Sequence, residues 1–164
     1  MIMLVAIGFA VAGGFVWGRL TDRIGPKRTL LIVLCGWIGL FIAAALIGLL
    51  NLPLWAFYVL ACATGLAMGG TWAADRPLML RLTPPDRVGE FYGLYGMVGR
   101  FAAITGPGLW AFIVGYVFEG KTQIGQPVGV LVLGGLVVIS LLILWPVSDR
   151  PGQPTPQAAS EPQG

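Results

Sequence analysis

The apolar residues of this chain fall into five long blocks separated by short polar gaps. A helix needs about 20 apolar residues to cross roughly 30 Å of hydrocarbon. All but the first block reach this length, and the first is marginal. A helix satisfies its own backbone in lipid, whereas an open strand edge does not, and the polar alternation of a barrel strand is missing. The pattern therefore predicts an all-α membrane protein with transmembrane helices at about residues 1–18, 29–50, 52–74, 86–118 and 127–147.

Charged residues are scarce. Ten Lys and Arg and seven Asp and Glu make up 10% of the chain, while 57% is apolar and the mean hydropathy is +0.85. A soluble domain carries roughly 25% charged residues, so a water-soluble enzyme or binding module is excluded. The cations lie between apolar blocks and do not cluster on a polar face, which excludes nucleic acid as a partner and favours the lipid bilayer.

Side chains for catalysis or metal binding are also scarce. The sequence contains no histidine, which excludes His-based triads and metal sites. Cys35 and Cys62 lie inside apolar blocks, fit no metal or redox spacing, and suit small core positions. We therefore predict no enzyme activity, no catalytic residue, no metal and no cofactor.

The basic residues are distributed unequally between the two sides of the predicted bundle. By the positive-inside rule, the side that holds eight of the ten cations faces the cytoplasm, together with the C-terminus. The opposite side holds only Lys121. Residues 149–164 are rich in Pro, Gln, Ser and Ala and predict a disordered cytoplasmic tail. The eight cations are Arg19, Arg23, Lys27, Arg28, Arg76, Arg81, Arg87 and Arg150.

The gap after the first block has a fixed order of residues. It contains Gly18, Asp22, Arg23, Gly25, Lys27 and Arg28 in the string Gly-Arg-Leu-Thr-Asp-Arg-Ile-Gly-Pro-Lys-Arg. Gly25 supplies the backbone freedom that a tight reversal needs. A plain basic loop would explain the cations but not this order. The string resembles the signature loop of the major facilitator superfamily, Gly-x-Leu-x-Asp-Arg-x-Gly-x-basic-basic, which implies a bundle of two six-helix halves.

A second stretch, residues 65–107, resembles one particular branch of this superfamily. Gly65 and Gly69 form a small-residue face that another helix can approach closely. The stretch is similar to the branch of the superfamily that contains the autophagy-linked fungal vacuolar effluxer and its bacterial relatives, although Asp75 stands where that branch has Ser. The resemblance implies that the five blocks are helices eight to twelve of a C-terminal half. It also implies a multi-pass protein of a bacterial inner membrane.

Three residues of the fourth block are candidates for the transport path. Two interpretations of Arg100 are possible. Its side chain either snorkels to the cytoplasmic interface, or faces a cavity and pairs with an anionic group of a solute. Gly106 and Pro107 allow the helix to bend, as helices that line a cavity often do. Every Asp and Glu, Asp75 included, is expected at or near a membrane face.

An ion pair between Asp22 and Arg76 is the sharpest site prediction. Pro77 disfavours helix at the residue before it, so Arg76 is expected to end the third helix at the cytoplasmic face. Asp22 follows the first block by about one turn. The two side chains would form a cytoplasmic clamp that closes that side of the transporter; the alternative is a solvated Asp22 without a partner.

The sequence thus predicts a secondary transporter that works by alternating access and is present as a partial C-terminal half. The resemblance implies a small solute such as an amino acid, and it implies missing N-terminal helices or a partner chain. The alternative is a membrane scaffold or a truncated transporter remnant that transports nothing, because five helices are fewer than the six of one half.

Overall fold

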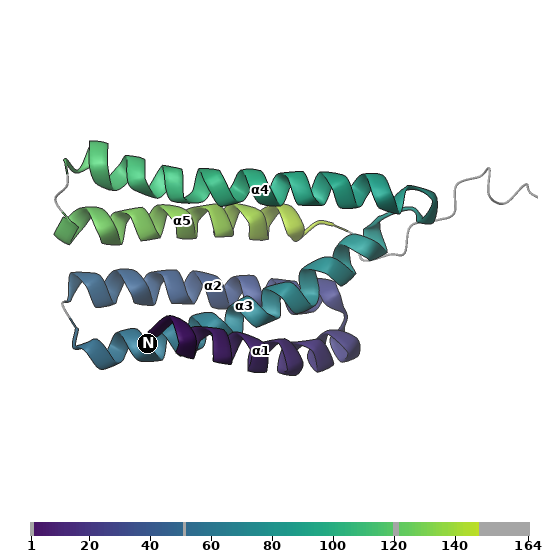
Figure 1. Ribbon diagram of the computed structural model, residues 1–164, viewed down its shortest axis with the longest axis horizontal. Coiled ribbons are helices and arrows are strands. Elements are labelled where there is room, and N and C mark those ends of the chain that lie inside the picture. Colours follow the sequence, from purple (N-terminus) through teal and green to yellow (C-terminus); the bar gives the residue numbers. More distant parts are fainter. Residues whose placement is uncertain (1, 51, 120–121, 148–164) are drawn as a thin grey trace, which may run out of the picture.

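The computed structural model describes residues 2–50, 52–119 and 122–147, and within them the chain forms five long helices (Figure 1). Each is long and apolar enough to cross a membrane. No strand occurs in these described ranges, so the predicted all-α membrane fold is confirmed. The helices are α1 (Ile2–Ile24), α2 (Pro26–Leu49), α3 (Leu54–Leu82), α4 (Val88–Phe112) and α5 (Thr122–Leu144), with a 3₁₀ turn η1 (Pro85–Arg87) before α4 and a π-helical turn η2 (Ile113–Val117) after it.

The helices pack in a chain of neighbours. α1 lies against α3, α2 contacts both α3 and α5, and α4 packs along α5 at the opposite edge from α1 (Figure 1). A small core joins α2 to α3, where Leu30 packs against Ala74 and Leu78. No described side chain of α4 is buried. The bundle is therefore tight around α1 and α3 and loose at α4.

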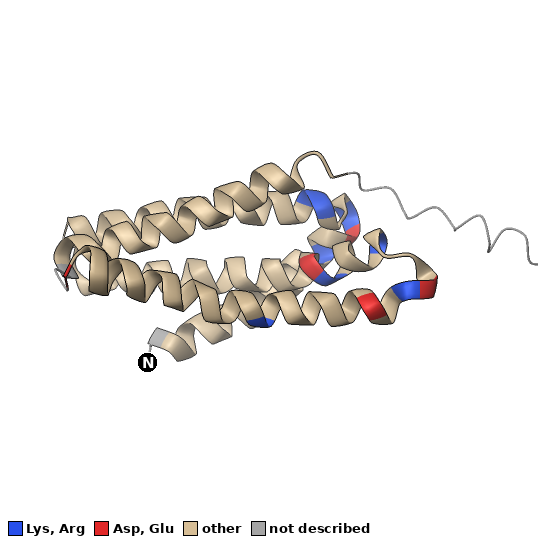
Figure 2. Ribbon diagram, turned by 90° about the horizontal axis from the view of Figure 1, so that it is seen from above, with Lys and Arg blue, Asp and Glu red and all other residues tan. Residues whose placement is uncertain are grey.

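The charged residues gather mainly at one end of the bundle. Figure 2 shows most of the Lys and Arg at the end that carries the α1–α2 turn and the α3–α4 connection. This is the distribution that the positive-inside rule uses to orient a membrane protein. The predicted tail, residues 149–164, lies outside the described residues.

The third helix does not end before Pro77, and this prediction is wrong. α3 continues through Pro77 to Leu82. Proline removes one helical hydrogen bond and usually kinks or breaks a helix. Here Ala74 and Leu78, on either side of Pro77, are 0% and 4% exposed and pack against α2. This packing stabilises helix on both sides of the proline.

Two of the connections between helices are shorter than expected. The interval 19–28 is helical except at Gly25, because α1 runs to Ile24 and α2 begins at Pro26. The stretch 119–126, which lies between the fourth and fifth predicted helices, is partly helical, since α5 begins at Thr122 and runs through Pro127. The prediction placed the helix ends at the limits of the apolar blocks. It missed these extra helical turns because they contain polar residues.

Candidate functional site at the cytoplasmic end

The signature loop is a reversal at a single residue. Gly25 has φ 88° and ψ 153°, a region that is essentially restricted to glycine. Its N–H donates to the Thr21 carbonyl at 3.0 Å, and its own carbonyl accepts from the Thr29 backbone N–H at 3.1 Å and from the Thr29 hydroxyl at 2.9 Å. Pro26 then occupies the first position of α2, where its fixed φ favours helix. These bonds hold the ends of α1 and α2 in a fixed relation.

Lys27 of the loop reaches the last helix. Its Nζ donates to the Trp145 carbonyl at 3.0 Å, just beyond the end of α5. A cation at the C-terminal end of a helix satisfies an otherwise unpaired carbonyl and interacts favourably with the helix dipole. The signature loop therefore connects α2 to the end of α5. Arg28 is exposed beside them, and Lys27, Arg28, Leu31 and Trp145 line a cavity of about 410 Å³.

Asp22 and Arg23 are exposed in the last turn of α1. Asp22 borders a cavity of about 430 Å³ that Gly18, Pro77 and Arg81 also line. Among the described side chains, the structure does not bring Asp22 into an ion pair with Arg76; the recorded pair is Arg87 with Asp86, at 3.7 Å. The Asp22–Arg76 clamp therefore stays a prediction for a state closed on the cytoplasmic side.

A hydrogen bond joins α3 to α4. The Tyr95 hydroxyl donates to Oδ2 of Asp75 at 2.5 Å. Arg76, next to Asp75 on α3, interacts electrostatically with the same phenol. The acid, the phenol and the guanidinium thus meet where α4 passes α3.

Asp75 also faces a cavity of about 390 Å³ between α2, α3 and α5. Thr71, one turn before Asp75, accepts from Trp37 Nε1 at 2.9 Å and donates to the Ala67 carbonyl at 3.0 Å. Sequence reasoning placed Asp75 at a membrane face and gave it no role. The four-residue spacing of Thr71 and Asp75 signalled one polar helix face, but no sequence signal pointed to Tyr95 as the partner.

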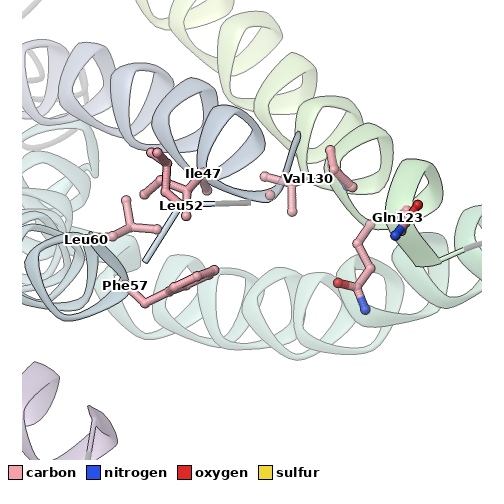
Figure 3. A pocket seen from close by; sticks show the side chains of 10 residues that line it. Ile47, Leu52, Phe57, Leu60, Gln123 and Val130 are labelled. Carbon is pink, nitrogen blue, oxygen red and sulfur yellow. The ribbon is translucent and has the colours of Figure 1, made fainter. Parts of the chain in front are cut away.

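Another cavity, of about 460 Å³, lies near the opposite end of the bundle (Figure 3). Gln123 and Gln126, at the start of α5, line it beside apolar side chains from α2, from α3 and from the connection between these helices. Figure 3 shows Gln123 and Val130 facing Phe57 and Leu60 across this space. The sequence analysis did not identify either glutamine, because both precede residue 127, where the fifth helix was predicted to begin.

The candidate residues of the fourth block lie further along α4 than Tyr95, the residue that bonds to Asp75. Arg100 is exposed on α4, so both readings of its role stay open. α4 continues through Gly106 and Pro107 to Phe112. The irregularity in this region lies further on, in the π-helical turn at Ile113–Val117. Such turns are frequent at functional sites.

A sequence profile of the Major Facilitator Superfamily matches residues 1–163. The chain belongs to this superfamily. Membership identifies a multi-pass integral membrane protein of a transporter family and points to transport, not catalysis. No solved structure matches the chain significantly.

Fungal proteins are among the relatives of this superfamily member. It is 26% identical to Autophagy-related protein 22-2 of Aspergillus oryzae over 93% of its length, and 26% identical to Autophagy-related protein 22 of Neurospora crassa over 98%. It is 30% identical to Autophagy-related protein 22 of Pyricularia oryzae over 76%. The resemblance to this branch is therefore confirmed. The chain spans only 26%, 22% and 19% of these relatives.

Proposed function

We propose that this chain is part of a secondary transporter for small solutes and supplies five helices, eight to twelve, of its C-terminal half. The observation that carries the proposal is the signature loop. The residues of this loop match the family signature, and the chain reverses direction at Gly25 alone. Lys27 of the loop donates a hydrogen bond to the Trp145 carbonyl, just beyond the last helix. The relatives support the partial status, because the chain spans 26% of the Aspergillus oryzae protein and 22% of the Neurospora crassa protein. Solute would bind between two halves that rock to alternate access.

The substrate proposed from the resemblance is a small solute such as an amino acid. One half lacks the opposing wall of a central cavity, so the chain alone should show no saturable uptake in vesicles. Co-expression with the N-terminal helices of a related transporter should give saturable, exchangeable uptake of labelled amino acids. Saturable uptake by the isolated monomer would contradict the proposed partial status. Absence of uptake with any complementary helix set would favour the alternative, a membrane scaffold or transporter remnant.

The orientation proposed for the chain is a cytoplasmic C-terminus in a bacterial inner membrane. It is supported by the basic residues at the end that joins α1 to α2 and α3 to α4. Cysteine replacements in a background without Cys35 and Cys62 test it. Lys121→Cys should react with an impermeant thiol reagent from outside the cell, and Arg81→Cys should not. The reverse pattern would invert the topology.

The cytoplasmic clamp is proposed for the full-length transporter only. When the halves close on the cytoplasmic side, Asp22 would meet Arg76 and the N-terminal end of α4. Asp22→Asn and Arg76→Ala should each favour the inward-open state, and the double variant should add little more. A cytoplasmically closed structure with the two charged groups more than about 6 Å apart would contradict it.

A further inference from the structure

The cavity beside Asp75, which we call the Asp75 cavity, holds one ionisable side chain in an otherwise uncharged lining. Its walls come from α2, α3, α5 and the residues just after α5. Asp75 contributes a carboxylate, and Thr71 and Ser140 contribute hydroxyls. The remaining lining is aliphatic and consists of Leu30, Leu34, Ile143, Leu144 and Val147. An acid within a transmembrane bundle marks a functional site by default, because its charge is costly there.

Some of the polar groups that line the Asp75 cavity can still form hydrogen bonds to a ligand. Oδ2 of Asp75 accepts from Tyr95, but a carboxylate offers about four acceptor positions. The Thr71 hydroxyl is already engaged, since it accepts from Trp37 and donates to a backbone carbonyl. Ser140 has no recorded hydrogen bond to another described residue. Most of the acceptor capacity inside the cavity therefore belongs to Asp75 and Ser140.

The charge and shape of the lining select a class of ligand. A negative charge among aliphatic side chains favours a cation and repels an anion. Arg76, next to Asp75 in the chain, interacts with Tyr95 and does not line the cavity. Calcium takes about six to eight oxygen ligands, more than this lining offers, whereas an ammonium group needs only a few acceptors. The aliphatic wall suits an alkyl chain.

We propose that the Asp75 cavity binds a primary alkylammonium group. The ammonium would donate to the Asp75 carboxylate and to the Ser140 hydroxyl, and the alkyl chain would lie against the leucines of α2 and the aliphatic residues of α5. About 390 Å³ falls within the range of small-molecule sites. The proposal concerns equilibrium binding by this chain and does not depend on transport.

Thermal unfolding of the full chain in lipid nanodiscs at pH 7 provides a test. A ligand that binds the folded state raises the unfolding temperature in a saturable way. n-Butylammonium, which is cationic at this pH as a lysine side chain is, should do so, and 1-butanol and butyrate at the same concentrations should not. Asp75→Asn should weaken the apparent affinity at least about tenfold, because the charge-assisted bond is lost. Glu90→Gln, which removes an exposed α4 carboxylate outside the cavity, should leave it unchanged.

A second variant covers the case in which Asp75→Asn does not fold. Ser140→Leu fills the cavity from α5 and leaves Asp75 and Tyr95 in place, so it should also abolish the n-butylammonium effect. Far-ultraviolet circular dichroism verifies the helix content of each variant. An equal shift with 1-butanol would overturn the proposal and indicate an apolar or lipid-filled space. Retention of the effect in Ser140→Leu, or in a folded Asp75→Asn, would overturn it as well.

Discussion

Glycines have opposite surroundings in two regions of this bundle. On α3, a Cβ added at Gly65 or Gly69 would lie 2.3 Å from a carbonyl oxygen of α1, that of Ala6 or Ala10. On α4, a Cβ added at Gly93 or Gly96 would meet nothing within 4 Å. The glycines of α3 therefore permit direct backbone contact with α1, whereas these two glycines of α4 touch no neighbouring helix.

The difference shows where the stability of the chain resides. Between membrane helices, association depends on close van der Waals packing, which small residues permit. That packing is concentrated where α1 meets α3, whereas α4 carries glycines that lower its helix propensity without any gain in contact. Elements that move in function are drawn from the less stable parts of a protein. α4, which also holds Arg100 and Pro107, buries no described side chain and therefore belongs to the less stable part of this chain.

The largest expected effect comes from filling the α1–α3 contact. Gly69→Ala places a methyl group against the α1 backbone, 2.3 Å from the Ala10 carbonyl oxygen and 2.5 Å from the Gly14 nitrogen, so the helices must separate. We expect a loss of about 3 kcal/mol or more, at the upper end of overpacking effects. Unfolding in mixed detergent micelles, followed by circular dichroism, measures this change.

Gly93→Ala on α4 is the matched control, with the same chemical change in open surroundings. It should raise stability by up to about 1 kcal/mol, because alanine has the higher helix propensity. Opposite signs for the two variants would support the comparison. A loss at Gly93 as large as that at Gly69 would show that α4 is packed in solution.

The next effect concerns the reversal that connects α1 to α2. Gly25→Ala forces a side chain into a backbone region that only glycine adopts easily, at φ 88° and ψ 153°. The expected loss is on the order of 2 kcal/mol, measured by the same unfolding experiment. Gly36→Ala, in an open position of the adjoining helix, is the control and should be neutral or slightly stabilising. A neutral Gly25→Ala would mean that the loop readily adopts another conformation.

The comparison also shows what the sequence could and could not reveal. Five apolar blocks predicted the membrane helices, and the spacing of Gly65 and Gly69 predicted a face for close helix contact. The spacing of the glycines did not predict that α1 would be the helix that packs on this face, because the three-dimensional packing of the helices decides that. Pro77 misled the prediction because buried neighbours outweigh the local preference of proline. The Asp75–Tyr95 bond joins residues 20 positions apart through a crossing that only the fold creates.

A smaller effect is expected from releasing α4 from α3. Tyr95→Phe removes the hydroxyl that donates to Asp75, and the net loss should be about 1 kcal/mol. Because α4 buries no described side chain, amide hydrogen exchange should rise in α4 more than in α1 or α3. Tyr92→Phe is the control: its ring packs edge-on to Tyr95, and no hydrogen bond is recorded for its hydroxyl among described residues. Equal exchange in both variants would show that the bond does not hold α4.

The smallest effect tests whether α4 is held indirectly through α5. Lys27→Met keeps most of the side-chain length but removes the bond from Nζ to the Trp145 carbonyl, which should lower stability by about 0.5 kcal/mol. Arg28→Met removes the same charge from the neighbouring exposed position and is the control for charge alone. Since α4 packs mainly on α5, exchange in the last turn of α5 and in the adjoining part of α4 should rise only in Lys27→Met. If both variants raise exchange equally, the basic charge and not the bond stabilises this end, and the contrast between α1–α3 and α4 does not depend on the signature loop.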